Sequence, residues 1–329
     1  MNIKIKQALI STKYFSVIAA TVVFVIAFVF GSAMFRGFFD FQTFFNLFID
    51  KSFLLVSAMG MSLVILSGGI DLSVGSVLAL TAMIISSLTE INGVNPGIAV
   101  FIALVTGTLI GLSMGLIIAC WNVPPFIATL AGMFFARGAC YIISIKDIVI
   151  HNPVLYDLAL WKFHFGGLGF ISFGVIISLV VVGVIHYISL YTKLGRNIYA
   201  IGGNESSALL MGIPVKKAKI IIYTINGLCS SIAGVVFSLY MLSGYGLHGL
   251  GMELDVIAAV VIGGTLLAGG TGYVYGSILG VLNLGIIQSL IMFQGKINSW
   301  WTKIFVGVLL LLFIGLQRVI VSLGERKKA

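Results

Sequence analysis

The sequence predicts an all-α membrane protein with about ten spanning helices. Of its 329 residues, 60% are apolar and only 9% are charged, and the mean hydropathy is +1.16. A soluble domain carries about a quarter charged residues, so this chain has too little polar surface to stay dissolved. The 40 glycines suit helices that pack closely in lipid, where small residues let two backbones approach each other.

Ten apolar stretches approach or exceed the roughly 20 residues that cross about 30 Å of hydrocarbon. They cover residues 15–35, 52–70, 72–90, 97–120, 125–144, 171–190, 218–242, 255–270, 272–293 and 301–320. The first follows a basic segment as a signal peptide would, but its apolar run is too long and no cleavage site follows. We expect it to be retained, and we expect residues 1–329 to form a single membrane domain.

The distribution of basic residues predicts the orientation of the chain. With ten spans, residues 1–14, residues 191–217 and the tail after 320 fall on the same side. These segments and their borders hold twelve cations and two acids, whereas the segments on the opposite side hold six cations and seven acids. We expect the basic side, with both termini, to be cytoplasmic. The net charge of +9 is therefore a topology signal and does not indicate nucleic-acid binding.

The long polar connection at residues 145–170 divides the ten spans into two halves of five. An odd number per half makes the second half enter the membrane from the opposite side, so an internal duplication would be inverted. Each half contains a glycine break beside a polar segment. These breaks are Gly68-Gly69 in the first half, and Gly263-Gly264 with Gly269-Gly270 in the second. The alternative is that glycine-rich membrane helices resemble one another by composition alone.

Residues 67–76, SGGIDLSVGS, contain a carboxylate beside a glycine pair between two apolar runs. Such a group is costly in or near lipid and often has a function, and glycines let a membrane helix stop and restart where the backbone lines a cavity. Ser67 and Asp71 are therefore candidates for a substrate pathway or gate. The alternative for Asp71 is to cap a helix that begins at Leu72.

Three amides inside apolar spans are further pathway candidates, namely Asn226, Asn283 and Gln288. The alternative is that they join helices through hydrogen bonds, as most such amides do. Arg137 lies within the fifth span, where its side chain would either extend to the outer interface or pair with an acid from another helix. Trp300 and Trp301, with Lys303, are typical of an outer-interface belt.

The largest polar interruption of the apolar pattern is residues 191–217. Asn204 before Glu205 is a good start for a helix over 206–211, and Gly212 followed by Pro214 is a good stop. Gly202-Gly203 would allow a sharp turn. A short helix on the cytoplasmic face would let a motor protein dock, and the alternative is a surface loop. The candidate docking residues are Gly202, Gly203, Asn204, Glu205 and Gly212.

No catalytic residue, metal site or cofactor site is predicted. The sequence has no GxxxxGK[ST], HExxH or GxSxG motif, and its four histidines are dispersed. Cys120, Cys140 and Cys229 have no CxxC or CxxH spacing, and we expect them to be free, buried thiols. Coupling to an ion gradient usually requires several intramembrane acids, and Asp71 alone lies within the apolar stretches. An ion-coupled carrier is nevertheless kept as the alternative to a transporter driven by a separate ATPase.

Three long motifs resemble those of one family, the membrane permeases of bacterial ATP-driven (ABC) sugar importers of the ribose, xylose and galactose group. They are SGGIDLSVGS at 67–76, AIGGNESSALLMGI at 200–213 and ELDVIAAVVIGGTLLAGGTGYVYG at 253–276. The resemblance implies a type II importer-like bundle in the bacterial inner membrane. It also implies a homodimer or heterodimer of permeases, an ATPase pair that meets residues 200–213, and a soluble or lipid-anchored sugar-binding protein outside.

Within that group, residues 129–138, 244–255 and 299–304 most resemble a permease of the galactofuranose importer. A monosaccharide is a neutral polyol, so its path requires amides, hydroxyls and aromatic faces. Since the polar residues in the spans are sparse, we expect the contacts with the sugar to be weak. The sugar-binding protein, which delivers the cargo, would then mainly decide which sugar is imported.

Overall fold

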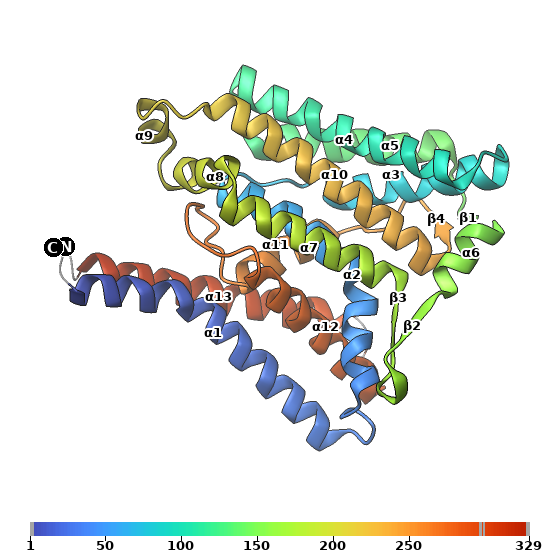
Figure 1. Cartoon of the computed structure of the whole chain (residues 1–329), viewed down its shortest axis with the longest axis horizontal. Coiled ribbons are helices and arrows are strands. Elements are labelled where there is room, and N and C mark those ends of the chain that lie inside the picture. Colours follow the sequence, from blue (N-terminus) through green and yellow to red (C-terminus); the bar gives the residue numbers. More distant parts are fainter. Residues whose placement is uncertain (1–2, 296–297, 299, 327–329) are drawn as a thin grey trace.

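The structure is a computed structural model that describes residues 3–295, 298 and 300–326, with side chains described for residues 17–295, 298 and 300–315. Helices make up most of it (Figure 1). The helices are α1 (Ile3–Met34), α2 (Phe41–Leu66), α3 (Val74–Ser86), α4 (Pro96–Trp121), α5 (Pro125–Ile143), α6 (Pro153–Leu160), α7 (Phe173–Tyr191), α8 (Lys193–Gly203), α9 (Glu205–Leu210), α10 (Val215–Met241), α11 (Met252–Ile262), α12 (Gly276–Gln294) and α13 (Trp301–Arg326). A π-helical turn, Ser87–Ile91, extends α3.

Two short antiparallel strand pairs complete the described chain. Strand β1 (Ile148–Val149) pairs with β4 (Ser243–Gly244), and β2 (Lys162–His164) pairs with β3 (Phe170–Ser172). The second pair forms a hairpin that lies with α6 at one end of the bundle. Helices α8 and α9 lie at the other end, toward which the N-terminal end of α1 and the C-terminal end of α13 also point (Figure 1).

The prediction of an all-α membrane protein is confirmed. Within the described residues, eight helices are long and apolar enough to cross a bilayer, and residues 301–315 of α13 form a further apolar helix. Helix α2 begins at Phe41, well before the expected start at residue 52, because Asp40 caps it by accepting a hydrogen bond from the Gln42 backbone N–H at 3.3 Å. Asp50 and Lys51, which precede the span expected at residues 52–70, are therefore part of this helix.

The span expected at residues 255–270 is wrong as a continuous helix. Helix α11 has 11 residues, which is about 16 Å of helix, and an irregular segment follows it from Gly263 to Tyr275. Gly263 packs against Gly276 so closely that a Cβ on either residue would overlap the backbone of the other. The chain therefore turns at Gly263, and the crossing is discontinuous.

Irregular backbone also precedes α11. Residues 243–251 run along α3, where Gly244 lies against Ala82 and Met83, and Gly249 lies against Gly75. Backbone without regular structure is tolerated at membrane depth only where protein or a water-filled cavity surrounds it. Here α3 and α5 cover it.

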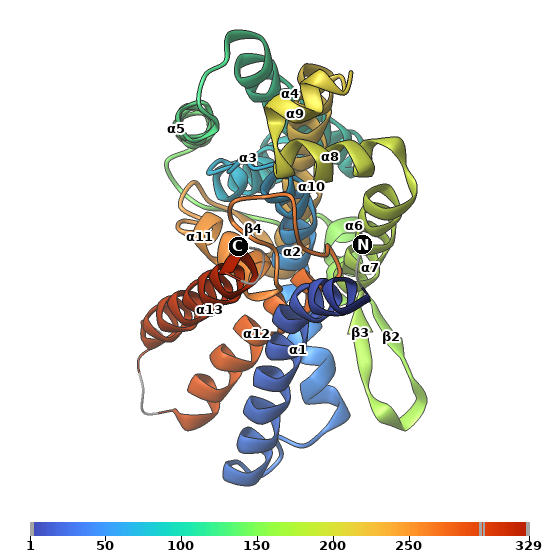
Figure 2. The ribbon, with the colours of Figure 1, turned by 90° about the vertical axis from the view of Figure 1, so that its left-hand side faces the viewer.

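Helix α10 lies at the centre of the bundle, between α2, α3 and α4 (Figure 2). Small residues make this packing possible. A Cβ on Gly111 of α4 would lie 2.9 Å from Gly227 Cα of α10, and a Cβ on Gly60 of α2 would lie 2.8 Å from Cys229 Cβ. The glycines therefore bring the backbones of α2 and α4 against α10, as the composition predicts.

The three cysteines are free. Cys140 and Cys229 are buried as expected, but the prediction is wrong for Cys120, which is exposed on the last turn of α4. Several charged residues used to predict the orientation lie outside the residues whose side chains are described. They are Lys4, Lys6, Lys13, Lys296, Arg318, Glu325, Arg326, Lys327 and Lys328.

Candidate functional site

The chain breaks between α2 and α3 at the first predicted glycine pair. Gly68 has a φ of +83°, a left-handed conformation that glycine adopts without the cost a side chain would add. The Gly69 backbone N–H donates to the Val64 carbonyl at 3.0 Å and closes the end of α2. A Cβ on Gly69 would overlap the hydroxyl of Tyr223 in α10, so this position also needs glycine for contact.

Asp71 lies in this break and is 1% exposed. One carboxylate oxygen accepts from the Ser73 backbone N–H at 2.7 Å and from the Ser73 hydroxyl at 2.6 Å. The other accepts from the side-chain amide of Asn226 at 2.7 Å. The bond to Asn226 therefore ties the break to the centre of α10.

Asp71 does not directly precede a helix that begins at Leu72, as we considered, because the helix begins two residues later. Helix α3 begins at Val74 with Ser73 before it, and Asp71 orders this start through the two bonds to Ser73. Ser67 is also buried in the break, where its hydroxyl donates to the Val64 carbonyl at 2.7 Å. Ser67, Asp71 and Asn226 thus belong to one buried region at the α2–α3 break.

The other two predicted pathway residues lie elsewhere. The Asn283 amide of α12 donates to the Ala20 carbonyl of α1 at 3.0 Å and to the Leu279 carbonyl at 2.8 Å, so it joins two helices. Gln288 accepts a hydrogen bond from the ammonium group of Lys51 in α2. The structure therefore does not gather the five candidates into one site.

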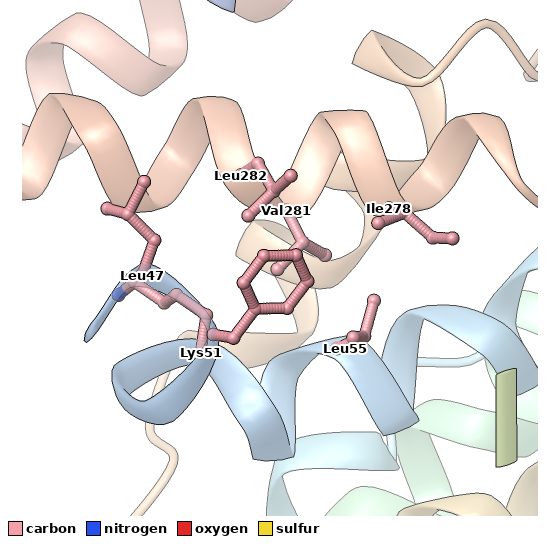
Figure 3. A pocket seen from close by; sticks show the side chains of 7 residues that line it. Leu47, Lys51, Leu55, Ile278, Val281 and Leu282 are labelled. Atoms are coloured by element: carbon pink, nitrogen blue, oxygen red, sulfur yellow. The ribbon is translucent and has the colours of Figure 1, made fainter. Parts of the chain in front are cut away.

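Lys51 and Gln288 border two crevices between α2 and α12. One is apolar except for Lys51, which lies at its edge (Figure 3). Its lining residues are Leu47, Phe48, Lys51, Leu55, Ile278, Val281 and Leu282. The neighbouring crevice adds Asp50, Gln288 and Ser289 to the polar groups. In the described part of the chain, both are small and are lined by residues of α2 and α12 alone.

A polar cluster that the sequence does not predict lies around these crevices. The Tyr240 hydroxyl of α10 donates to Asp50 at 3.2 Å, and Lys303 of α13 forms an ion pair with Asp255 of α11 at 2.6 Å. Lys303 thus has a partner inside the chain, while Trp300 and Trp301 beside it are exposed as a membrane belt requires. Recognising Asp40 as a helix cap would have put Asp50 and Lys51 in α2.

Arg137 of α5 forms hydrogen bonds with backbone carbonyls, which we did not predict. Its guanidinium donates to the backbone carbonyls of Gly246 and His248, at 2.5 and 2.7 Å. These carbonyls belong to the irregular segment that runs along α3, so they lack the partners a helix would supply. Arg137 therefore supplies the hydrogen bonds that these two carbonyls would otherwise lack, and it holds this segment against α5.

The polar segment 191–217 contains two helices, whereas we expected one. Helix α9 corresponds to the predicted helix, with Asn204 as its cap accepting from the Ser207 backbone N–H at 2.7 Å, and with Gly212 at a φ of +78° at its end. Helix α8 was missed, although Thr192 marks its start by accepting from the Gly195 N–H at 3.2 Å.

The end of α9 carries an exposed apolar group. Leu209, Leu210 and Met211 are 63%, 89% and 69% exposed. Ala208 is buried with Ile201, Val215 and Ala218 in a small core that joins α8, α9 and α10. An ion pair of 2.6 Å between Glu205 and Lys219 also holds α9 to α10. These three side chains are thus exposed above a packed base, and α9 lies at the end of the bundle (Figure 1).

The sequence is similar to several permeases. It is 44% identical over 309 residues to the inner membrane ABC transporter permease protein YjfF of Escherichia coli (strain K12), covering 93% of each chain. It is 40% identical over 329 residues to the fructose import permease protein FruG of Bifidobacterium longum (strain NCC 2705), covering 94% of this chain and 93% of that one. It is 39% identical over 287 residues to the ribose import permease protein RbsC of Escherichia coli (strain K12), covering 86% and 88%.

No solved structure matches the chain. Residues 43–314 match the family described as the branched-chain amino acid transport system / permease component, and this range runs from the first turn of α2 to α13. The match and the relatives agree on a transport subunit, which is not itself an enzyme. The chain therefore belongs to this family of membrane permeases of ABC transporters.

Proposed function

We propose that this protein is the membrane permease of an ATP-driven importer that carries a monosaccharide across the bacterial inner membrane. Family membership supports a permease driven by a separate ATPase. The observation that carries the proposal is the exposed apolar end of α9, since Leu209, Leu210 and Met211 lie at one end of the bundle on a helix too short to cross a bilayer. Exposed apolar patches of this kind mark interaction sites.

The ATPase would dock on α9 and the loop to α10. Asn204, Glu205 and Gly212 would act by shaping α9, as its cap, its ion pair to Lys219 and its stop. This docking makes the α8–α9 end cytoplasmic. Helices α1 and α13 extend toward that end, so both termini would be cytoplasmic as well.

Two permeases would form the conduit together, as a homodimer or with a related second chain. The resemblance to sugar importers implies a pair of permeases, and a path between the two chains would fit the small size of the crevices in the described part of one chain. A soluble or lipid-anchored sugar-binding protein would deliver the cargo at the opposite end, near α6 and the β2–β3 hairpin. Alternating access would result when ATP binding closes the ATPase pair.

The substrate class follows from the relatives. FruG and RbsC are named for fructose and ribose, and these names favour a monosaccharide over the amino acids in the family description. Galactofuranose is our first candidate because residues 129–138, 244–255 and 299–304 most resemble a permease for that sugar. Exchanging the binding protein while keeping this permease should change which sugar is imported, because the described spans offer few polar contacts.

Reconstitution into vesicles tests the proposal. The permease should accumulate radiolabelled galactofuranose, or a related pentose or hexose, only with its ATPase, its binding protein and ATP. The alternative, an ion-coupled carrier, predicts uptake by the permease alone when a proton or sodium gradient is applied. Uptake under a gradient without nucleotide would contradict our proposal, and competition with unlabelled ribose, fructose and leucine would define the substrate class.

A further inference from the structure

Three glycine pairs that are far apart in the sequence meet in the structure. They follow α2 (Gly68-Gly69), end α8 (Gly202-Gly203) and lie in the irregular segment after α11 (Gly269-Gly270). The Gly270 backbone N–H donates to the Leu66 carbonyl at 2.9 Å, so the segment after α11 is hydrogen-bonded to the end of α2. We call the contact of these three segments the glycine joint.

The backbones in the glycine joint touch without intervening side chains. A Cβ on Gly202 would overlap the Leu66 carbonyl oxygen and would lie 2.5 Å from the Gly270 nitrogen. A Cβ on Gly270 would lie 2.6 Å from the Gly203 nitrogen, and one on Gly269 would lie 2.7 Å from the Gly68 nitrogen. Each distance is below that of ordinary van der Waals contact, so even alanine would force the segments apart.

One more contact ties α8 to the same segment. The Tyr199 hydroxyl donates to the Gly272 carbonyl at 3.1 Å, while the Ser189 hydroxyl lies 3.3 Å from the Tyr199 oxygen. Ile198 and Ile201 of α8 are buried as well. Helix α8 is thus held on the bundle, and it shares the small core that anchors α9.

We propose that Gly202 and Gly270 are positioning residues of the transport cycle, because the glycine joint transmits movement of α9 to the α2–α3 break and to the segment after α11. The proposal rests on the proposed function, in which an ATPase moves α9. Side chains can change rotamer and absorb a small displacement, whereas backbones in direct contact pass it on. The break that receives the movement is fixed to α10 through Asp71 and Asn226.

The experiment compares Gly202→Ala and Gly270→Ala with Gly183→Ala in the complete transporter with its ATPase and binding protein. Gly183 lies in α7, where a Cβ would meet none of the described atoms within 4 Å. We expect the two joint variants to bind the ATPase and to hydrolyse ATP, since α9 is unchanged, while sugar imported per ATP hydrolysed falls about tenfold. Gly183→Ala should import as the unmodified protein does.

Tyr199→Phe keeps the test decisive if the alanine variants do not fold. It removes only the hydroxyl that donates to Gly272, and we expect a reduction of about threefold in import per ATP. Hydrogen exchange adds a readout that a purely structural role would not change. In the unmodified transporter, protection of residues 67–73 should differ between the nucleotide-free and the ATP-bound ATPase, and Gly202→Ala should abolish this difference.

Equal import per ATP in Gly202→Ala and Gly183→Ala would overturn the proposal that the glycine joint transmits movement. The same holds if Tyr199→Phe imports normally or if the exchange of residues 67–73 does not respond to ATP. These outcomes are distinct from failure of the proposed function, because in that case the unmodified transporter itself would show no ATP-dependent uptake.

Discussion

Asp71 and Asn226 show what a single buried pair does in this protein. The carboxylate is buried without a cation beside it and accepts hydrogen bonds from Ser73 and Asn226. An isolated buried charge is costly, and these donors offset the cost. The sequence alone could identify Asp71 as unusual, but its partner Asn226 lies 155 residues away and emerged only from the folded structure.

Replacing Asn226 with alanine should destabilise the protein by about 1–3 kcal/mol, because one oxygen of a buried carboxylate loses its donor. Thermal unfolding of the purified permease in detergent measures this. Asn92→Ala is the control, since Asn92 is exposed, and its midpoint should stay near that of the unmodified protein. Equal midpoints for the two variants would show that the Asp71–Asn226 bond does not stabilise the fold.

Gly60→Ala should destabilise the contact of α2 with α10. The new Cβ would lie 2.5 Å from the Asn226 side-chain oxygen and 3.2 Å from the Asn226 Cα, so the helices must separate, at about 1–3 kcal/mol. Gly138→Ala in α5 is the matched control, because its Cβ would meet none of the described atoms within 4 Å. The same unfolding assay should rank Gly138→Ala at or above the unmodified protein, since alanine favours helix. A tolerated Gly60→Ala would contradict close packing here.

Helices α8 and α9 share a small core, but only one of them is predicted from the sequence. The sequence predicts α9 because its cap and stop are local signals, and it misses α8 because Gly195, Gly202 and Gly203 weaken the helical pattern. Tertiary contact compensates for this. Gly195 lies against the Ser189 carbonyl and Gly202 lies against the Leu66 carbonyl, so these glycines are needed for packing and α8 forms despite its low helix propensity.

Leu210→Asp should weaken binding of the ATPase by about 2 kcal/mol, or roughly 30-fold in Kd, because a charge replaces an apolar contact. Co-purification and a titration in detergent would measure the loss. Leu168→Asp is the control, since Leu168 is also exposed but lies in the hairpin connection at the opposite end. Equal ATPase binding by both variants would argue against docking at α9.

For the whole molecule, the arrangement predicts which residues face each side of the membrane. In a Cys120→Ser background, which removes the exposed native thiol, a cysteine at Ser206 should react with a membrane-impermeant maleimide only in inverted vesicles. A cysteine at His164 should react only in right-side-out cells, because the hairpin lies at the other end of the bundle. Labelling of both from the same side would contradict the proposed orientation.

Composition and local pattern were enough to predict a helical membrane protein, most of its spans and the cap of α9, because apolar length and capping chemistry act within a few residues. The discontinuous crossing around α11, the bonds of Arg137 to backbone carbonyls and the meeting of three glycine pairs could not be predicted in that way. Each depends on which segments become neighbours when the helices pack. In lipid that choice rests on shape and on hydrogen bonds between distant residues, and neither is visible along the chain.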